Sequence, residues 1–263
     1  QRFLGLGLSH IIEGVFKLVV GIGFVLGGMG VAGAVWGVNA SYIGAFLFSF
    51  FPLKMYFHAS QKKVEKREII TYSLPVLVVL LALTALYSFD VFLVKHYFSG
   101  QDAGFYAAGT LLGKIVFFAT LSIALVMFPK VAESYEQKNF SNVRRVLNLS
   151  LSFILMMSLG ILAFYLLFPN LVILVLFGKN FLAVKQIMWL FAIVYGMFSL
   201  IYALSMYNLS IHRYSFIYFI LAMNVVEMVL IILFHQSLMH VLTMVSIVLL
   251  TLLSILLLDL PDV

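Results

Sequence analysis

Residues 104–128 read GFYAAGTLLGKIVFFATLSIALVMF and contain a single charged side chain, Lys114. A membrane-spanning helix needs about 20 mostly apolar residues, so this segment is long enough to cross a bilayer. The strands of a lipid-facing barrel alternate apolar and polar residues, and this run does not alternate. The segment therefore predicts a transmembrane helix.

The whole chain has the composition of a membrane protein. Of its 263 residues, 64% are apolar and only 10% are charged, whereas soluble domains have about 25% charged residues. A water-soluble domain of this length could not hide so much apolar surface. The composition excludes a cytosolic enzyme, a secreted disulfide scaffold and a disordered tail. The absence of Cys also excludes disulfide and thiol chemistry.

Other segments meet the same length criterion, and together they predict an all-α, polytopic transmembrane helix bundle of eight spans. The expected spans are Phe3–Leu26, Val31–Leu53, Ile69–Phe98, Gly104–Phe128, Val143–Phe168, Val184–Leu209, Tyr214–Phe234 and Met239–Leu258. The segment Leu171–Phe181 is too short to cross and predicts an interfacial helix followed by a turn at Gly178. Pro75 lies inside the third span and predicts an irregularity there.

Basic residues are concentrated on one side of these expected spans. That side has 11 lysines and arginines, namely Arg2, Lys54, Lys62, Lys63, Lys66, Arg67, Lys130, Lys138, Arg144, Arg145 and Arg213. The other side has 3, namely Lys95, Lys179 and Lys185. Cytoplasmic loops are enriched in Lys and Arg, so we expect the first side, and both ends of the chain, to be cytoplasmic.

Five ionisable side chains fall inside the expected spans: Glu13, Lys17, Asp90, Lys114 and Glu227. Each would cost about 2.5–3.5 kcal/mol or more at the bilayer centre, so we expect them to face the bundle interior or to pair. Glu13 and Lys17 are four residues apart on one helix and can pair. Asp90 and Lys114 lie about 16 and about 20 Å from the turn near Gln101. At that similar depth they either share a polar cavity or form a structural ion pair.

Polar stripes on otherwise apolar helices add candidates for a polar interior. Asn39 and Tyr42 share a flank of the second span, and Tyr195 and Tyr202 share a face of the sixth. One such stripe usually makes interhelical hydrogen bonds, but several in one chain favour a shared cavity.

Glycines predict two local features of the bundle. Gly109 and Gly113 form a small-xxx-small pair, which predicts close helix packing. The run Gly28–Gly33 matches a G-x-G-x-x-G string but has no preceding strand, so it predicts the turn of a transmembrane hairpin.

Nothing in the sequence points to catalysis. No Ser/His/Asp set, phosphate-binding loop or pair of carboxylates in catalytic spacing is present, so we expect no enzyme and no cofactor. His235 and His240 flank one short loop without further ligands nearby, so no metal site is expected.

Several short motifs, in their order and spacing, resemble the polysaccharide-export flippases of the multidrug/oligosaccharidyl-lipid/polysaccharide exporter superfamily. The motifs are Gly28–Ala34, Asp90–Lys95, Ala103–Ala108, Leu112–Lys114, Phe128–Lys130 and Leu176–Phe181. The resemblance covers roughly residues 1–210 and implies a fold of two six-helix lobes. Residues 1–53 would then be the last two helices of the first lobe, 54–68 a cytoplasmic linker between the lobes, and 69–263 the second lobe. The first helices of the first lobe would be missing from this chain.

The resemblance implies a flippase that moves a lipid-linked oligosaccharide across the cytoplasmic membrane of a prokaryote, in contact with membrane lipid and with H⁺ or Na⁺ but not with nucleic acid. Such a headgroup needs a polar cavity with cations for its phosphates. Lys17 and Lys114 are the candidate cations. The other expected cavity residues are Asp90, Glu13, Glu227, Asn39, Tyr42, Tyr195 and Tyr202.

Two alternatives stay open at this point. An ion-coupled multidrug antiporter of the same superfamily would use Asp90 or Glu227 as its coupling carboxylate. A non-transporting membrane scaffold would have no aqueous cavity, so water-soluble probes would not reach residues 17 and 114.

Overall fold

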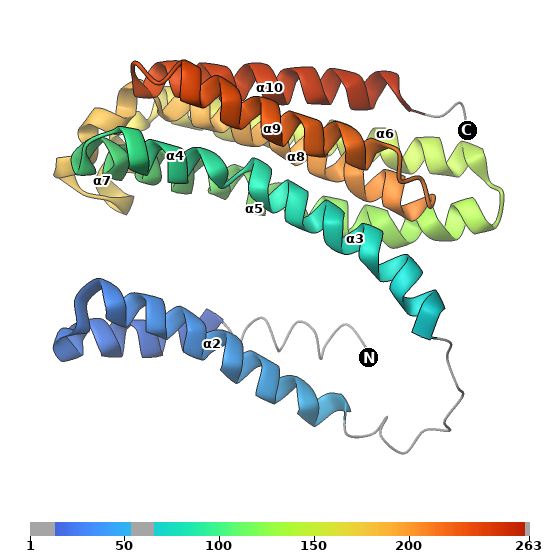
Figure 1. Ribbon diagram of the computed structural model, residues 1–263, viewed down its shortest axis with the longest axis horizontal. Coiled ribbons are helices and arrows are strands. Elements are labelled where there is room, and N and C mark those ends of the chain that lie inside the picture. Colours follow the sequence, from blue (N-terminus) through green and yellow to red (C-terminus); the bar gives the residue numbers. More distant parts are fainter. Residues whose placement is uncertain (1–13, 54–65, 261–263) are drawn as a thin grey trace. The chain divides into compact units, whose positions relative to one another are not determined.

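The computed structural model describes residues 14–53 and 66–260, and the elements formed by these residues are all helical. The chain divides into two compact units, residues 1–65 and 66–263 (Figure 1). Seven segments of the described residues are long and apolar enough to cross a membrane. The all-α, multi-pass membrane architecture predicted from the sequence is therefore confirmed.

The first unit contains a tight helical hairpin. Residues 14–24 are helical, the chain reverses through η1 (Val25–Met29), and α2 (Gly30–Leu53) follows. Gly28 and Gly30 have φ angles of +89° and +53°, which side chains with a Cβ rarely adopt. The hairpin turn predicted at Gly28–Gly33 is therefore confirmed.

The two arms of this hairpin touch through their backbones. A Cβ added to Gly37 would lie 2.4 Å from the Cα of Gly21, so glycine is required at this contact. The first candidate span, Gly14–Phe48, includes the reversal between the two arms. The count of eight spans and the side of the membrane on which the chain ends remain predictions.

The second unit is a bundle of helices (Figure 1). Its elements in chain order are α3 (Lys66–Leu86), α4 (Phe89–Tyr97), α5 (Gly100–Glu136), α6 (Phe140–Leu167), α7 (Pro169–Leu176), η3 (Lys179–Gln186), α8 (Met188–Ser210), α9 (Phe216–Leu233) and α10 (Leu238–Leu258). Three of these helices begin at side-chain caps, in which Ser99, Asn139 and Ser237 accept hydrogen bonds from the backbone N–H groups three residues later. Such caps satisfy N–H groups that have no partner within the helix.

Helix α8 is the centre of this bundle. It packs against α5, α6 and α10. Of the residues in its most apolar stretch, 67% are buried, whereas the buried share is at most 39% in the other candidate spans. Helices that are apolar on all sides belong in a protein core or in lipid. The position of α8 brings its aromatic side chains into contact with α5.

The α5–α8 contact depends on the small-xxx-small pair. A Cβ added to Gly109 would lie 2.1 Å from the Phe191 ring, and one added to Gly113 would lie 2.1 Å from the Tyr195 ring. The two rings of α8 therefore occupy notches that the glycines leave on α5. The close packing predicted for this pair is confirmed.

The third expected span corresponds to one candidate membrane span, Ser73–Tyr97, which contains a helix break that the sequence did not predict. The helical assignment of α3 continues through Pro75, and the chain leaves the helix instead at Tyr87–Ser88. The predicted single span Ile69–Phe98 is thus two helices, and α3 begins at Lys66, inside the linker expected over 54–68. Residues 54–65 of that linker lie outside the described residues.

The sequence also predicted where α5 and α7 end. Helix α5 continues through Pro129 to Glu136, eight residues beyond the expected end at Phe128. The short helix α7 ends before Gly178, whose φ is +81°, and η3 follows. This arrangement confirms a short helix followed by a turn at Gly178.

Candidate functional site

Asp90 lies in the first turn of α4, directly after the break between α3 and α4, and is only 3% exposed. Its Oδ1 accepts a hydrogen bond from the backbone N–H of Val91 at 2.8 Å. Its Oδ2 accepts one from the hydroxyl of Tyr106 on α5, also at 2.8 Å. A helix N-terminus favours an acidic side chain electrostatically. The helix break therefore provides a favourable position for a buried acid.

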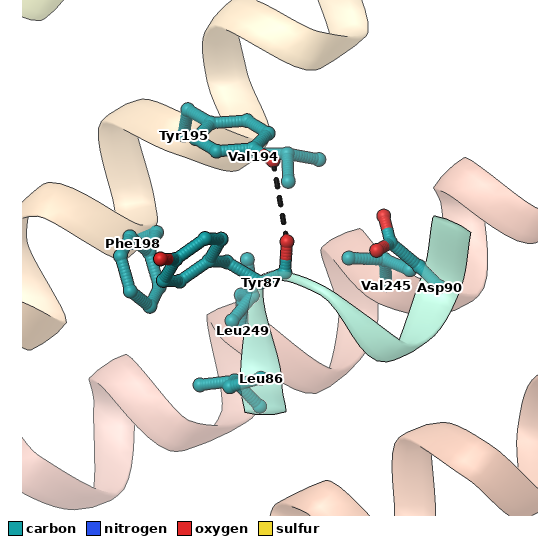
Figure 2. Close-up of a pocket in the computed structure, with 8 residues that line it drawn as sticks. All are labelled: Leu86, Tyr87, Asp90, Val194, Tyr195, Phe198, Val245 and Leu249. Carbon is teal, nitrogen blue, oxygen red and sulfur yellow. Dashed lines mark hydrogen bonds between the residues drawn. The ribbon is translucent and has the colours of Figure 1, made fainter. Parts of the chain in front are cut away.

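The same break leaves a backbone carbonyl available to α8. The hydroxyl of Tyr195 donates a hydrogen bond to the carbonyl oxygen of Tyr87 at 3.4 Å (Figure 2). A small pocket of about 10 Å³, lined by Tyr87, Asp90, Tyr195 and Phe198 among others, lies here. Such a volume is close to the space needed by one water molecule. Irregular backbone at membrane depth is tolerated where it is buried in protein or lines a polar cavity.

Lys114 contributes a cation beside this pocket. Its Nζ lies 5.2 Å from the ring centroid of Tyr87, within cation–π distance. It interacts electrostatically with Asp90, but no ion pair joins the two side chains in the described structure. The permanent Asp90–Lys114 ion pair considered from the sequence is therefore not formed, because Asp90 bonds to Tyr106 instead.

Glu227 on α9 is 0% exposed. Neither of its carboxylate oxygens has a hydrogen-bond partner among the described residues. One turn earlier, Asn224 donates to the carbonyl oxygens of Ala82 at 3.1 Å and Ile220 at 2.8 Å, while its Oδ1 also lacks a partner in this part of the chain. Helix α9, which contains Glu227, packs against α3 and against α4, which contains Asp90.

Asp90 bonds to Tyr106 and lines one pocket with Tyr195, and Asn224 and Glu227 lie on α9, which packs against α4. We name these five side chains the Asp90–Glu227 cluster. It draws on α4, α5, α8 and α9. An unpaired buried carboxylate costs several kcal/mol, so the charge on Glu227 must be neutralised by a proton or by a cation.

The structure brings together four of the nine expected cavity residues, namely Asp90, Lys114, Tyr195 and Glu227. Tyr202 lies farther along α8. Its ring packs against the ring of Phe117, with 5.3 Å between the two ring centroids. Sequence reasoning omitted Tyr87, Tyr106 and Asn224 from the expected cavity residues. Asn224 could have been included, because it lies one helical turn before Glu227 and is polar in an apolar span.

The remaining expected residues belong to the first unit. Lys17 Nζ lies 5.0 Å from the ring centroid of Tyr42, and Tyr42 is 55% exposed. Asn39 is exposed and donates to the carbonyl oxygen of Val35 at 3.0 Å. Glu13 lies outside the described residues. A common cavity formed by residues of both units remains a prediction.

Comparison with known families identifies the chain. A family model described as polysaccharide biosynthesis protein matches residues 1–186. The chain belongs to this family. Membership confirms the assignment to the superfamily that the sequence motifs resemble. None of the curated proteins compared with the chain matches it.

A solved structure of similar fold, described as MATE in the bent conformation, aligns with a TM-score of 0.67 and 13% sequence identity. The alignment covers 95% of this chain and 60% of that protein's chain, so this chain spans about three fifths of its length. This likeness shows that the two proteins share a fold.

Proposed function

We propose that the chain is part of a flippase that moves a lipid-linked oligosaccharide from the cytoplasmic to the outer leaflet of a prokaryotic cell membrane. The family match supports a role in polysaccharide biosynthesis. The observation on which the proposal rests is Lys114, a half-buried cation inside a candidate span. Charges at membrane depth are expensive and usually mark a transport pathway.

The chemistry of such a substrate fits the side chains near Lys114. The phosphates of a lipid-linked sugar bind well to a cation, and no carboxylate forms an ion pair with Lys114 among the described residues. Tyr202 can contact sugar hydroxyls from the second unit, as Asn39 and Tyr42 can from the first. The lipid tail stays in the bilayer while the two units alternate between inward-open and outward-open states.

The test replaces Lys114 by Gln in the full-length protein, reconstituted in vesicles with a fluorescent lipid-linked oligosaccharide. Loss of a charge-assisted contact of about 1.5–3 kcal/mol should slow flipping by about ten- to hundred-fold. The yield of folded protein should stay normal. Lys185→Gln, an exposed lysine near the start of α8, is the matched control and should flip normally.

The outcome separates flippase from scaffold. Normal flipping in Lys114→Gln would contradict the proposed phosphate contact, and absence of flipping in every variant would favour a scaffold. Because the chain has no native Cys, Lys17→Cys and Lys114→Cys would each be the single thiol. A water-soluble thiol reagent should label both in a transporter and neither in a scaffold.

We infer that the Asp90–Glu227 cluster binds the ion, H⁺ or Na⁺, that drives transport. The inference is supported by the two oxygens of Glu227, which have no hydrogen-bond partner among the described residues, and by the packing of α9 against α4, which contains Asp90. Glu227→Gln removes the charge and keeps the shape of the side chain. The variant should lose the acceleration of flipping by a pH or Na⁺ gradient, while Glu136→Gln, an exposed residue at the end of α5, should keep it. Unchanged gradient dependence in Glu227→Gln would disprove coupling through this carboxylate.

A multidrug antiporter is the second candidate, because the fold is shared with MATE. The same vesicles distinguish the two functions. An antiporter should accumulate an organic cation such as ethidium under an ion gradient and should leave the lipid-linked oligosaccharide on its original side.

A further inference from the structure

A groove of about 420 Å³ runs along the outside of α5 and α6. Its floor includes Met127, which is 1% exposed, and its walls include Val126 and Phe153, which are 56% and 50% exposed. Lys130 also lines the groove. This groove is separate from the Asp90–Glu227 cluster, whose side chains do not line it.

The groove has the length of one bilayer leaflet. On α5 its lining extends from Ser122 to Lys130, which is about 12 Å along a helix axis. One leaflet contributes about half of the roughly 30 Å hydrocarbon thickness. An acyl chain that entered beside Lys130 would therefore follow the groove to near the middle of the membrane.

Charge is concentrated at the Lys130 end only. Between residues 130 and 145 the chain has four basic residues, Lys130, Lys138, Arg144 and Arg145, and two acidic residues, Glu133 and Glu136. Arg145 lies one turn before Leu149, which lines the groove. The nearest acid along α5, Glu133, accepts a hydrogen bond from Gln137, and no ion pair joins Lys130 to a carboxylate within residues 66–260.

We propose that this groove binds an anionic phospholipid, with one acyl chain between α5 and α6 and its phosphate at Lys130. An apolar slot with a cation at its membrane-surface end matches the amphipathic shape and the charge of such a lipid. Each basic residue near a membrane surface favours an anionic lipid by a free energy that corresponds to about five-fold in affinity. The bound lipid fixes the α5–α6 pair from outside, independently of the transported substrate.

The experiment measures quenching of a groove tryptophan by brominated lipids in vesicles that contain the full-length protein. Trp36 and Trp189 are replaced by Phe, and Phe153→Trp provides the reporter. Brominated phosphatidylglycerol should compete about five-fold better for the groove than brominated phosphatidylcholine. The preference should fall to near one in Lys130→Gln, remain in Lys130→Arg, and decrease in high salt.

Two controls locate the effect. Lys185→Gln removes an exposed lysine far along the chain and should leave the preference unchanged. Leu166→Trp places the tryptophan reporter at an exposed position of α6, the helix of Phe153, but outside the groove. The two brominated lipids should quench this reporter equally. The groove proposal fails if quenching by the two lipids is equal at position 153, or if the preference survives in Lys130→Gln. It also fails if a polyprenyl pyrophosphate displaces the lipid at far lower amounts than phosphatidylglycerol, because the groove would then bind the substrate lipid.

Discussion

At the scale of single residues, the two buried acids of the second unit have opposite surroundings. Each oxygen of Asp90 accepts a hydrogen bond, one from Val91 and one from Tyr106. The oxygens of Glu227 accept none from the described residues. Buried polar groups are usually satisfied, and each exception requires an explanation. Two hydrogen bonds therefore hold Asp90 in place, whereas none within the described residues holds the carboxylate of Glu227.

The Tyr106–Asp90 hydrogen bond should contribute measurably to stability. Tyr106→Phe leaves a buried carboxylate oxygen without its donor and should lower the free energy of unfolding by about 1.5–3 kcal/mol. Thermal unfolding in detergent would measure the loss. In a protein that already contains Asp90→Leu, Tyr106→Phe should lower the free energy of unfolding far less, because the acceptor of the hydrogen bond is absent. Equal losses in both backgrounds would show that the Tyr106 hydroxyl acts through another contact.

At the scale of elements, the α5–α8 contact positions the site. Phe191 and Tyr195 fit against Gly109 and Gly113, and this fit sets the rotation of α8 about its axis. That rotation directs the Tyr195 hydroxyl to the Tyr87 carbonyl at the break between α3 and α4. A change in the glycine notch should therefore disturb the polar cluster as well as the packing.

Gly113→Ala tests this dependence. The added Cβ would lie 2.1 Å from the Tyr195 ring, and such overpacking should lower the free energy of unfolding by about 1–3 kcal/mol despite the better helix propensity of Ala. Gly104→Ala on the same helix meets no atom within 4 Å and should be neutral or stabilising by up to about 1 kcal/mol. If both variants had the same melting temperature, the notch would have no role in packing.

At the scale of the whole molecule, the uneven distribution of basic residues sets the expected orientation in the membrane. Helix α5 has 37 residues, about 55 Å of helix, which exceeds the roughly 30 Å hydrocarbon core. Its last turns therefore extend beyond the lipid tails at the end that includes Lys130, Glu133 and Glu136. This placement agrees with a hydrophilic region on the side expected to be cytoplasmic.

Reporter fusions test that orientation. Alkaline phosphatase fused after Ser99, in the turn between α4 and α5, should be active because it is outside the cell. A fusion after Gln137, in the turn between α5 and α6, should be inactive. The reverse pattern would invert the map of the second unit and would place Lys130 in the outer leaflet.

Composition and the lengths of the apolar runs are enough to predict a bundle of apolar helices in a membrane. Lipid contains no water to satisfy backbone groups, so long apolar runs such as 104–128 must form helices there. The sequence also indicated the hairpin at Gly28–Gly33 and the notch at Gly109 and Gly113, because the lack of a Cβ is a local property. Hydropathy could not detect the break at Tyr87–Ser88, since both residues lie within one continuous apolar run.

Which polar side chains meet depends on how the helices pack. The sequence placed Asp90 and Lys114 at similar depth, but depth does not specify the direction in which each helix face points. Packing rotates α5 so that Tyr106 reaches Asp90 and Lys114 lies over the ring of Tyr87. It also places the helix of Glu227, which lies more than 130 residues after Asp90 in the sequence, against the helix of Asp90. Contacts between distant helices depend on the shapes of all the intervening side chains, which no local pattern contains.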